Sequence, residues 1–253
     1  LGAGCVVAVD AASRSLLWAH AYARFTPDEH ERGGGALLSA GEPTAILAQG
    51  FAVVSPYDGP GLVCLRLRDG HPVWHQPKRG RSRVAGIVNN CLIVVSDTAV
   101  ESLEVATGRR VWKLPLADIG RPSGRGILTP GSLLLPLDTP EVVEIGLADG
   151  RIQGRSRSRG GNVPGNLVAH RGEIISRGVD MLEVFHQETA LESRIETAKT
   201  REPSGPWASY WGAQMAIEQG DVRRGLELVS QAISSPSLRL APGDLSDTLV
   251  RAL

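Results

Sequence analysis

The sequence predicts a mainly β protein: part of a β-propeller built from four-stranded antiparallel blades, followed by an α-helical region. A phrase recurs along the chain, made of a short apolar strand, a turn of small residues and an apolar pair that ends in tryptophan. The tryptophan positions of successive copies lie 56, 38 and 42 residues apart, and a period near ~40 is typical of propeller blades. After residue 187 the apolar spacing changes from about 2 to about 3.6 residues, which indicates helices.

The composition supports a packed protein with many turns. The chain has 253 residues, 42% of them apolar, with 30 Gly and 16 Pro. Lys plus Arg and Asp plus Glu are equal at 27 each, so no overall charge favours nucleic acid or acidic lipid. No run approaches the ~18 apolar residues of a membrane helix. The three cysteines are scattered, and their redox state and the compartment stay open.

Strand and turn patterns predict about three complete blades and two partial ones. Asn89-Asn90 and Thr107-Gly108 tolerate the positive φ of tight hairpins. A ring closes with roughly 4–8 blades, so we expect a piece of a larger ring, and the start at Leu1 instead of Met agrees with this. Residues 24–43 are predicted to form a surface loop. The predicted strands are 5–9 and 16–20; 44–48, 51–55, 62–67 and 72–76; 84–88, 91–96, 100–105 and 109–114; 125–129, 132–137, 141–147 and 151–155; and 166–170, 173–177 and 181–187.

One tryptophan recurs on the outermost strand of successive blades, and one glycine recurs in the turn before that strand. A large rigid ring in this position would fill the wedge between neighbouring blades, and we expect a structural role in blade docking. The alternative is that a ring stacks on a flat cofactor. A fourth copy of the phrase has Gly154 in place of the tryptophan. The recurring residues are Trp18, Trp74 and Trp112, with Gly70, Gly108 and Gly150.

The region 188–253 is predicted to be helical and separate from the blades at 1–187. Helices are expected over 188–199, 207–219 and 221–233, interrupted at Pro203 and Pro206, with a further helix at 245–253. The second and third helices form a pair that resembles a tetratricopeptide repeat. The residues that carry this resemblance are Trp207, Trp211, Ala216, Gly220, Gly225, Val229, Ala232 and Pro236.

The blade phrase resembles the repeat of the pyrroloquinoline-quinone-like propellers, which include quinoproteins and BamB-like scaffolds and are related in architecture to WD40 propellers. Ala8, Asp10, Ser13, Leu17 and Trp18 carry the resemblance in the first copy. In later copies the Thr-Gly turn and the tryptophan are matched best, with Asp for Thr in one of them. The aspartate of the family repeat is matched only in the first copy. The matching residues in the later copies are Asp69, Gly70 and Trp74, and Thr107, Gly108 and Trp112. The residues that stand in place of the aspartate are Leu67, Val105 and Leu147.

This resemblance implies two different activities. The dehydrogenases of the family bind the quinone PQQ and calcium, with an adjacent pair of cysteines and with acidic and amide ligands. The present sequence has no adjacent cysteines and no acidic cluster with calcium-loop spacing. We therefore expect no catalytic, cofactor-binding or metal-binding residue. BamB-like members bind proteins, and the resemblance implies an extracytoplasmic location, periplasmic or elsewhere in the cell envelope of a bacterium.

Arginines gather in three segments, each of which follows the fourth strand of a blade. Because each blade has an even number of strands, these segments lie on one face of the ring. They predict a docking surface for an acidic partner, such as a protein segment or a glycan, and less so nucleic acid, since few aromatic residues accompany them. The alternative is solvated loops with locally paired arginines. This basic rim consists of Arg79, Arg81, Arg83, Arg121, Arg125, Arg155, Arg157 and Arg159.

The function predicted from these features is a non-catalytic propeller scaffold for protein–protein interaction or assembly. Two alternatives remain open. One is a fragment of a PQQ-dependent quinoprotein dehydrogenase, and the other is the ligand-sensing domain of a larger signalling protein.

Overall fold

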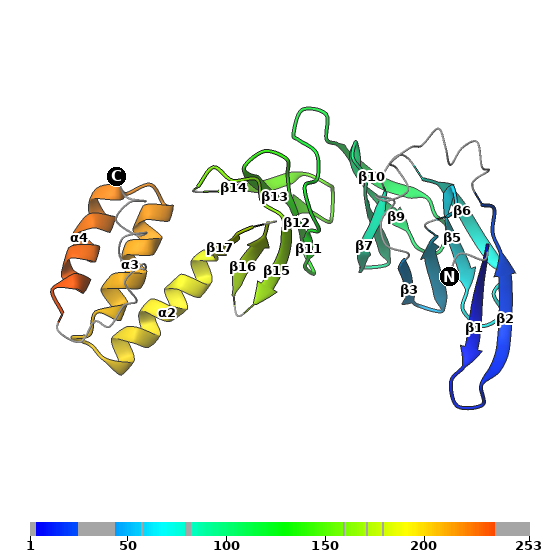
Figure 1. Cartoon of the computed structure of the whole chain (residues 1–253), viewed down its shortest axis with the longest axis horizontal. Helices are drawn as coiled ribbons and strands as arrows, with labels where there is room; N and C mark the ends of the chain where they lie inside the picture. The colour runs from blue at the N-terminus through cyan, green and yellow to red at the C-terminus, as the bar shows by residue number, and fades with distance from the viewer. Residues whose placement is uncertain are drawn as a thin grey trace. The chain divides into compact units, whose positions relative to one another are not determined.

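A computed structural model describes residues 4–24, 44–56, 58–78, 82–158, 160–170, 172–178 and 180–235. Over these residues the chain forms seventeen strands in five sheets, followed by three helices (Figure 1). Three of the sheets have four strands, each paired with its neighbour in sequence. The mainly β fold, a partial propeller of four-stranded blades, is therefore confirmed. Residues 25–43 of the expected surface loop and the expected helix at 245–253 lie outside the described residues.

We number the first four sheets as blades 1 to 4; the fifth is the three-stranded sheet β15–β17. Blade 1 is β1 (Cys5–Asp10) and β2 (Ser15–Ala21), and blade 2 is β3 (Thr44–Ala48), β4 (Phe51–Ser55), β5 (Gly61–Arg66) and β6 (Pro72–Pro77). Blade 3 is β7 (Arg83–Val88), β8 (Cys91–Val95), β9 (Ala99–Glu104) and β10 (Arg110–Pro115), and blade 4 is β11 (Ile127–Leu128), β12 (Ser132–Pro136), β13 (Glu141–Gly146) and β14 (Ile152–Arg157). The three-stranded sheet is β15 (Asn166–His170), β16 (Glu173–Arg177) and β17 (Leu182–His186).

The middle strands of blades 2 and 3 are apolar on both faces because each of these blades is packed between two others. In β8, Leu92 and Val94 belong to the core shared with blade 2, whereas Ile93 and Val95 belong to the core shared with blade 4. Successive side chains of a strand point to opposite faces. A strand covered on both sides therefore reads as a continuous apolar run, which is the sequence CLIVV of β8.

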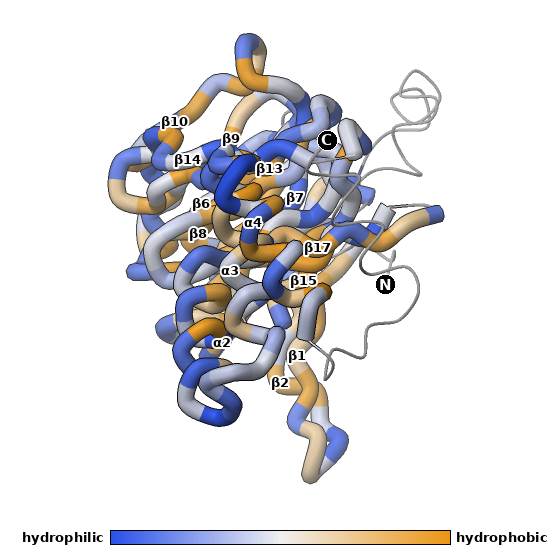
Figure 2. The backbone as a smooth tube through the Cα atoms, turned by 90° about the vertical axis from the view of Figure 1, so that its left-hand side faces the viewer, coloured by the Kyte–Doolittle hydropathy of each residue, from blue (hydrophilic) through white to orange (hydrophobic). Residues whose placement is uncertain are grey.

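The core is divided into clusters, one at each junction between neighbouring blades. Blades 2 and 3 share a cluster that contains Val53 and Leu62 from one blade and Leu92 and Leu103 from the other. The cluster between blades 3 and 4 includes fully buried Leu133, Leu135 and Leu137. Figure 2 colours the backbone by hydropathy and shows hydrophobic stretches among the strands. Burial at the junctions is what holds successive blades together.

Blades 2 to 4 have two distinct faces, which we call the hairpin face and the connection face. On the hairpin face, the turn between the third and fourth strands bonds to the turn between the first two, as in Val105 N–H to Asn90 O (2.9 Å). On the connection face, the segment leaving the fourth strand bonds to the turn between the middle strands. Leu116 N–H donates to Thr98 O at 2.9 Å in this way.

The chain divides into two compact units. One consists of Leu1–Arg157 and Asn162–Asn166, and the other of Ser158–Gly161 and Leu167–Leu253. The second unit holds most of β15, with β16, β17 and the helices α2 (Glu188–Arg201), α3 (Trp207–Glu218) and α4 (Val222–Ile233). These helices confirm the change of period after residue 187. The domain boundary at 187/188 and the tetratricopeptide resemblance stay predictions.

Close packing of α3 on α4 uses small residues. A Cβ added to Gly225 of α4 would lie 2.5 Å from Cγ1 of Ile217 in α3, so a larger residue would push the helices apart. Ala213 and Ala216 of α3 are buried at the same contact. Asp221 caps α4 by accepting a hydrogen bond from the Arg224 N–H at 3.0 Å.

Candidate functional site

Each recurring tryptophan lies against the recurring glycine of the next blade. A Cβ built on Gly70 would lie 2.5 Å from Cε3 of Trp18, and one on Gly150 would lie 2.5 Å from Cε3 of Trp112. A Cβ built on Gly108 would lie 2.7 Å from Cδ2 of Trp74. These glycines have φ of +71°, +70° and +73°, a left-handed conformation that disfavours other residues. Both the backbone shape and the space therefore restrict these positions to glycine.

The same tryptophans also form a repeated hydrogen bond. The indole N–H donates to the carbonyl oxygen three residues before the glycine: Leu67 for Trp18, Val105 for Trp74 and Leu147 for Trp112, at 2.8, 2.6 and 2.8 Å. The acceptors are backbone atoms at the positions where the family repeat has aspartate. The contact is therefore independent of the side chain there.

The fourth copy of the phrase breaks this series. Gly154 of β14 stands at the tryptophan position and pairs with Glu144 of β13. A Cβ on Gly154 would have only the Glu144 side chain within 4 Å, at 3.5 Å and beyond. No indole contact of this kind is therefore formed from blade 4 among the described residues.

The basic rim is described only in part, since Arg79, Arg81 and Arg159 lie outside the described residues. Arg83 begins β7 and donates a hydrogen bond to the Gly124 carbonyl of the following connection. Burial lowers the pKa of Arg83, and the neighbouring Arg125 adds to this, while Asp97 opposes it. The Arg83 side chain thus reaches the backbone of the next connection, at the residue before Arg125.

Hydrogen bonds join successive connections at equivalent residues, with the same separation in sequence each time. Arg83 to Gly124 O, Ser123 Oγ to Pro164 O and Arg125 N–H to Asn166 Oδ1 each link residues 41 apart. Close approach is required here, because a Cβ on Gly124 would lie 2.5 Å from the Gly165 backbone. The connection face therefore has a backbone fixed by repeated contacts, on which the arginines are mounted.

The remaining rim arginines differ in their pairing. Arg155 is ion-paired with Glu141, Nη1 to Oε2 at 3.0 Å. Arg121 is exposed, and its backbone N–H donates to Asp138 Oδ1 at 2.8 Å. Arg125 and Arg157 are also exposed. Arg121, Arg125, Arg155 and Arg157 are thus all exposed, and Arg155 is in addition paired with a local acid.

A buried polar cluster on the connection face was not singled out from the sequence. Asp58 is buried, accepts a hydrogen bond from Tyr22 Oη at 2.7 Å and pairs with Arg24 at 3.2 Å. Half-buried Lys78 donates to the Pro56 carbonyl. Burial lowers the pKa of the Lys78 amine to about 8, against the pull of Asp58. Asp58 is an isolated acid in a turn sequence, so no sequence pattern indicated its burial.

The described residues do not fit the cofactor set that the resemblance implies for dehydrogenases. The three cysteines Cys5, Cys64 and Cys91 are free thiols, and burial raises the pKa of Cys64 to about 11. Within the described ranges no group of three His, Cys, Asp or Glu side chains is placed to hold a metal ion. No catalytic step is assigned to these residues. None of the described helices is long and apolar enough to cross a membrane.

Comparisons with known proteins give one family. The sequence model described as "Outer membrane protein assembly factor BamB" matches residues 2–217. BamB from Moraxella catarrhalis matches in structure with a TM-score of 0.50 at 14% identity, over 74% of this chain and 54% of that one. A quinohemoprotein alcohol dehydrogenase from Comamonas testosteroni matches with a TM-score of 0.49 at 13% identity, over 68% and 37%.

The likeness to BamB is one of fold, and the chain spans about half (54%) of that protein's length. A search of curated proteins gave no match.

Proposed function

Because this chain belongs to the family of the outer membrane protein assembly factor BamB, we propose that it is a non-catalytic scaffold of the cell envelope. In this role its connection face binds an acidic segment of a partner protein. The observation that carries the proposal is that exposed Arg121, Arg125 and Arg157 lie on the connection face, whose backbone is fixed by contacts between successive connections. Several positive charges on one face favour an anionic partner that contacts more than one of them.

Local pairing decides which cations are available to a partner. Asp97 faces Arg83, and Glu141 holds Arg155. Within the described residues, the side chains of Arg121 and Arg157 form no ion pair with an acid. Both are exposed, and they are the cations that an acidic segment reaches first.

The chemistry of the rim favours an acidic protein segment over nucleic acid. A docking surface for single strands combines arginines with aromatic platforms on which bases stack. The connections 116–126 and 160–165 contain no aromatic residue. Guanidinium groups suit carboxylates because they donate two parallel hydrogen bonds.

The test compares two sets of three arginines with the same total charge. Arg121, Arg125 and Arg157 on the connection face are changed to Gln in one variant. Arg68, Arg109 and Arg151, which lie in the hairpin-face turns beside local acids, are changed to Gln in the control. Binding of fluorescein-labelled poly-L-glutamate to the full chain is followed by anisotropy at low and high salt.

We expect salt-sensitive binding that falls about tenfold in the first variant and less than about twofold in the control. Equal losses in the two variants would show that only net charge matters. That result, or the absence of binding to the folded wild type, would end the proposal.

A further inference from the structure

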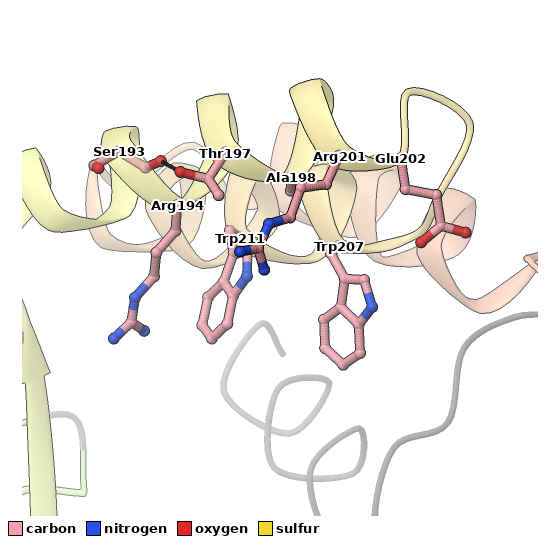
Figure 3. Close-up of a pocket in the computed structure, with 8 residues that line it drawn as sticks. All are labelled: Ser193, Arg194, Thr197, Ala198, Arg201, Glu202, Trp207 and Trp211. Atoms are coloured by element: carbon pink, nitrogen blue, oxygen red, sulfur yellow. Dashed lines mark hydrogen bonds between the residues drawn. The ribbon is translucent and has the colours of Figure 1, made fainter.

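A hollow of about 370 Å³ lies between α2 and α3 in the second unit (Figure 3). Its lining from α2 occupies one side of that helix, because the residues recur every three to four positions. We call this hollow the α2–α3 groove. It is lined by Ser193, Arg194, Thr197, Ala198, Arg201 and Glu202 together with Trp207 and Trp211.

One end of the groove holds a fixed cation. Arg194 Nη1 lies 2.7 Å from Glu173 Oε1 of β16, and its guanidinium carbon lies 4.8 Å from the centre of the Trp211 ring. The Arg194 side chain is 29% exposed. An arginine held by a carboxylate on one side and an indole face on the other loses little freedom when a ligand arrives.

The other end of the groove holds a second cation with a different environment. Arg201 is in the last turn of α2, two turns from Arg194, and it is exposed. It forms no ion pair with another residue of the described part of the chain. Lys199, by contrast, is paired with Glu196 at 2.8 Å and does not line the groove.

The two indoles supply flat apolar surface beside these cations. Trp207 and Trp211 are one turn apart on α3, and each contacts Tyr210 edge-on, with ring centres 5.9 and 4.9 Å apart. Figure 3 shows both indoles and both guanidinium groups on the same side of the helix pair. Tryptophan and arginine are the side chains that most often dominate binding energy at protein interfaces.

We propose that the α2–α3 groove binds an acidic peptide segment of a partner protein, in which large apolar side chains alternate with carboxylates. The apolar side chains pack on Trp207 and Trp211, and a carboxylate pairs with Arg201. This site is separate from the connection face and does not depend on the function proposed for it.

The test uses the full chain and a fluorescein-labelled peptide of alternating Glu and Phe. One control peptide has Lys in place of Glu, and a second has Ala in place of Phe. Arg201→Gln and Lys199→Gln form a matched pair of variants, since each removes one positive charge from the last turn of α2. All measurements are repeated in the background of Arg121→Gln, Arg125→Gln and Arg157→Gln, which separates this site from the basic rim.

We expect saturable binding of the Glu/Phe peptide that weakens about fivefold in Arg201→Gln and less than about twofold in Lys199→Gln. Trp207→Leu, which keeps an apolar side chain but removes the indole, should weaken it about tenfold. Far-UV circular dichroism checks that the helices are retained. Both control peptides should bind more weakly. The affinity for the Glu/Phe peptide should be the same with and without the three substitutions in the basic rim.

Four results would overturn the inference. They are the absence of saturable binding by the folded chain, equal binding of the Lys/Phe peptide, equal weakening by Arg201→Gln and Lys199→Gln, and loss of binding in the rim background. The last result would assign the peptide to the connection face, so a failure at either site is told apart from a failure at the other.

Discussion

The junction between blades 2 and 3 and the junction between blades 3 and 4 share the indole contact but differ in two other positions. Trp74 lies on Gly108 and Trp112 lies on Gly150, with the same indole hydrogen bond in both. The second strand begins with Phe51 in blade 2, where the ring packs into the junction, and with Cys91 in blade 3.

The connections that leave these blades differ as well. Half-buried Lys78 follows β6, whereas buried Leu116 follows β10, and each backbone N–H bonds to the turn between the middle strands. The tryptophan positions allow few substitutions, because each indole packs on a glycine and donates to a backbone carbonyl. The first position of the second strand, by contrast, holds a large side chain in blade 2 and a small one in blade 3, so it tolerates a smaller residue at a moderate cost in packing.

The largest effect is expected from removal of an indole at a fully formed junction. Trp112→Ala should lower the free energy of unfolding by about 3 kcal/mol, since it removes a large ring from the core shared by blades 3 and 4. Urea unfolding measures this. Trp112→Phe keeps a ring but removes the bond to Leu147 O, and should cost less, about 1–2 kcal/mol. Equal costs for the two variants would argue against a packing role.

The next effect separates backbone strain from contact with the ring. Gly108→Ala and Gly50→Ala both place Ala at positive φ, +70° and +80°, but a Cβ on Gly50 has nothing within 4 Å. We expect Gly50→Ala to cost about 1 kcal/mol and Gly108→Ala about 2 kcal/mol, because the second also displaces the indole. Thermal and urea unfolding of the two variants give the comparison. A Gly50→Ala variant as unstable as Gly108→Ala would reduce the effect to strain alone.

The connection after blade 2 should show a pH dependence that the connection after blade 3 lacks. Burial holds the pKa of Lys78 at about 8, below the 10.5 of a free lysine. Between these values the unfolded chain binds more protons than the folded one, so this group makes stability rise with pH over that window.

Lys78→Leu copies the Leu116 position and should remove the rise. From pH 8 to pH 10 the unfolding free energy of the wild type should rise by about 1 kcal/mol relative to that of Lys78→Leu, allowing for solvent screening. Urea unfolding at both pH values measures it. A difference independent of pH would contradict the burial of the amine.

The smallest effect is expected at Cys91. A hollow of about 230 Å³ lies beside it, lined in part by Val111, Pro130 and Leu147. Cys91→Leu should fill part of this space and raise the unfolding free energy by about 0.5 kcal/mol. Cys91→Ser, which fills nothing, is the control and should give no gain. A destabilised Leu variant would show that the hollow does not accommodate the larger side chain.

Local patterns were sufficient to predict the strands and helices. Turn pairs such as Asn89-Asn90 and the short apolar strands around them define each hairpin without help from distant residues. The tryptophan and glycine positions could also be found, because they recur.

The partners of these residues across the junctions required the structure. Nothing in the sequence around Arg83 shows that it contacts Gly124, since that contact depends on how one blade stacks on the next. The pairing of Arg194 with Glu173 is equally non-local. The seven-residue spacing of Arg194 and Arg201 and the four-residue spacing of Trp207 and Trp211 were signals that could have indicated the groove.

The most direct test of blade docking is a double-mutant cycle on Trp74→Ala and Gly108→Ala, followed by urea unfolding. If the indole rests on the glycine as described, Gly108→Ala should lose about half of its cost once the ring is gone, leaving the roughly 1 kcal/mol of strain expected for Gly50→Ala. The coupling should then be about 1 kcal/mol. If the cost of the double variant equals the sum of the two single costs, the contact between the indole and the glycine is contradicted.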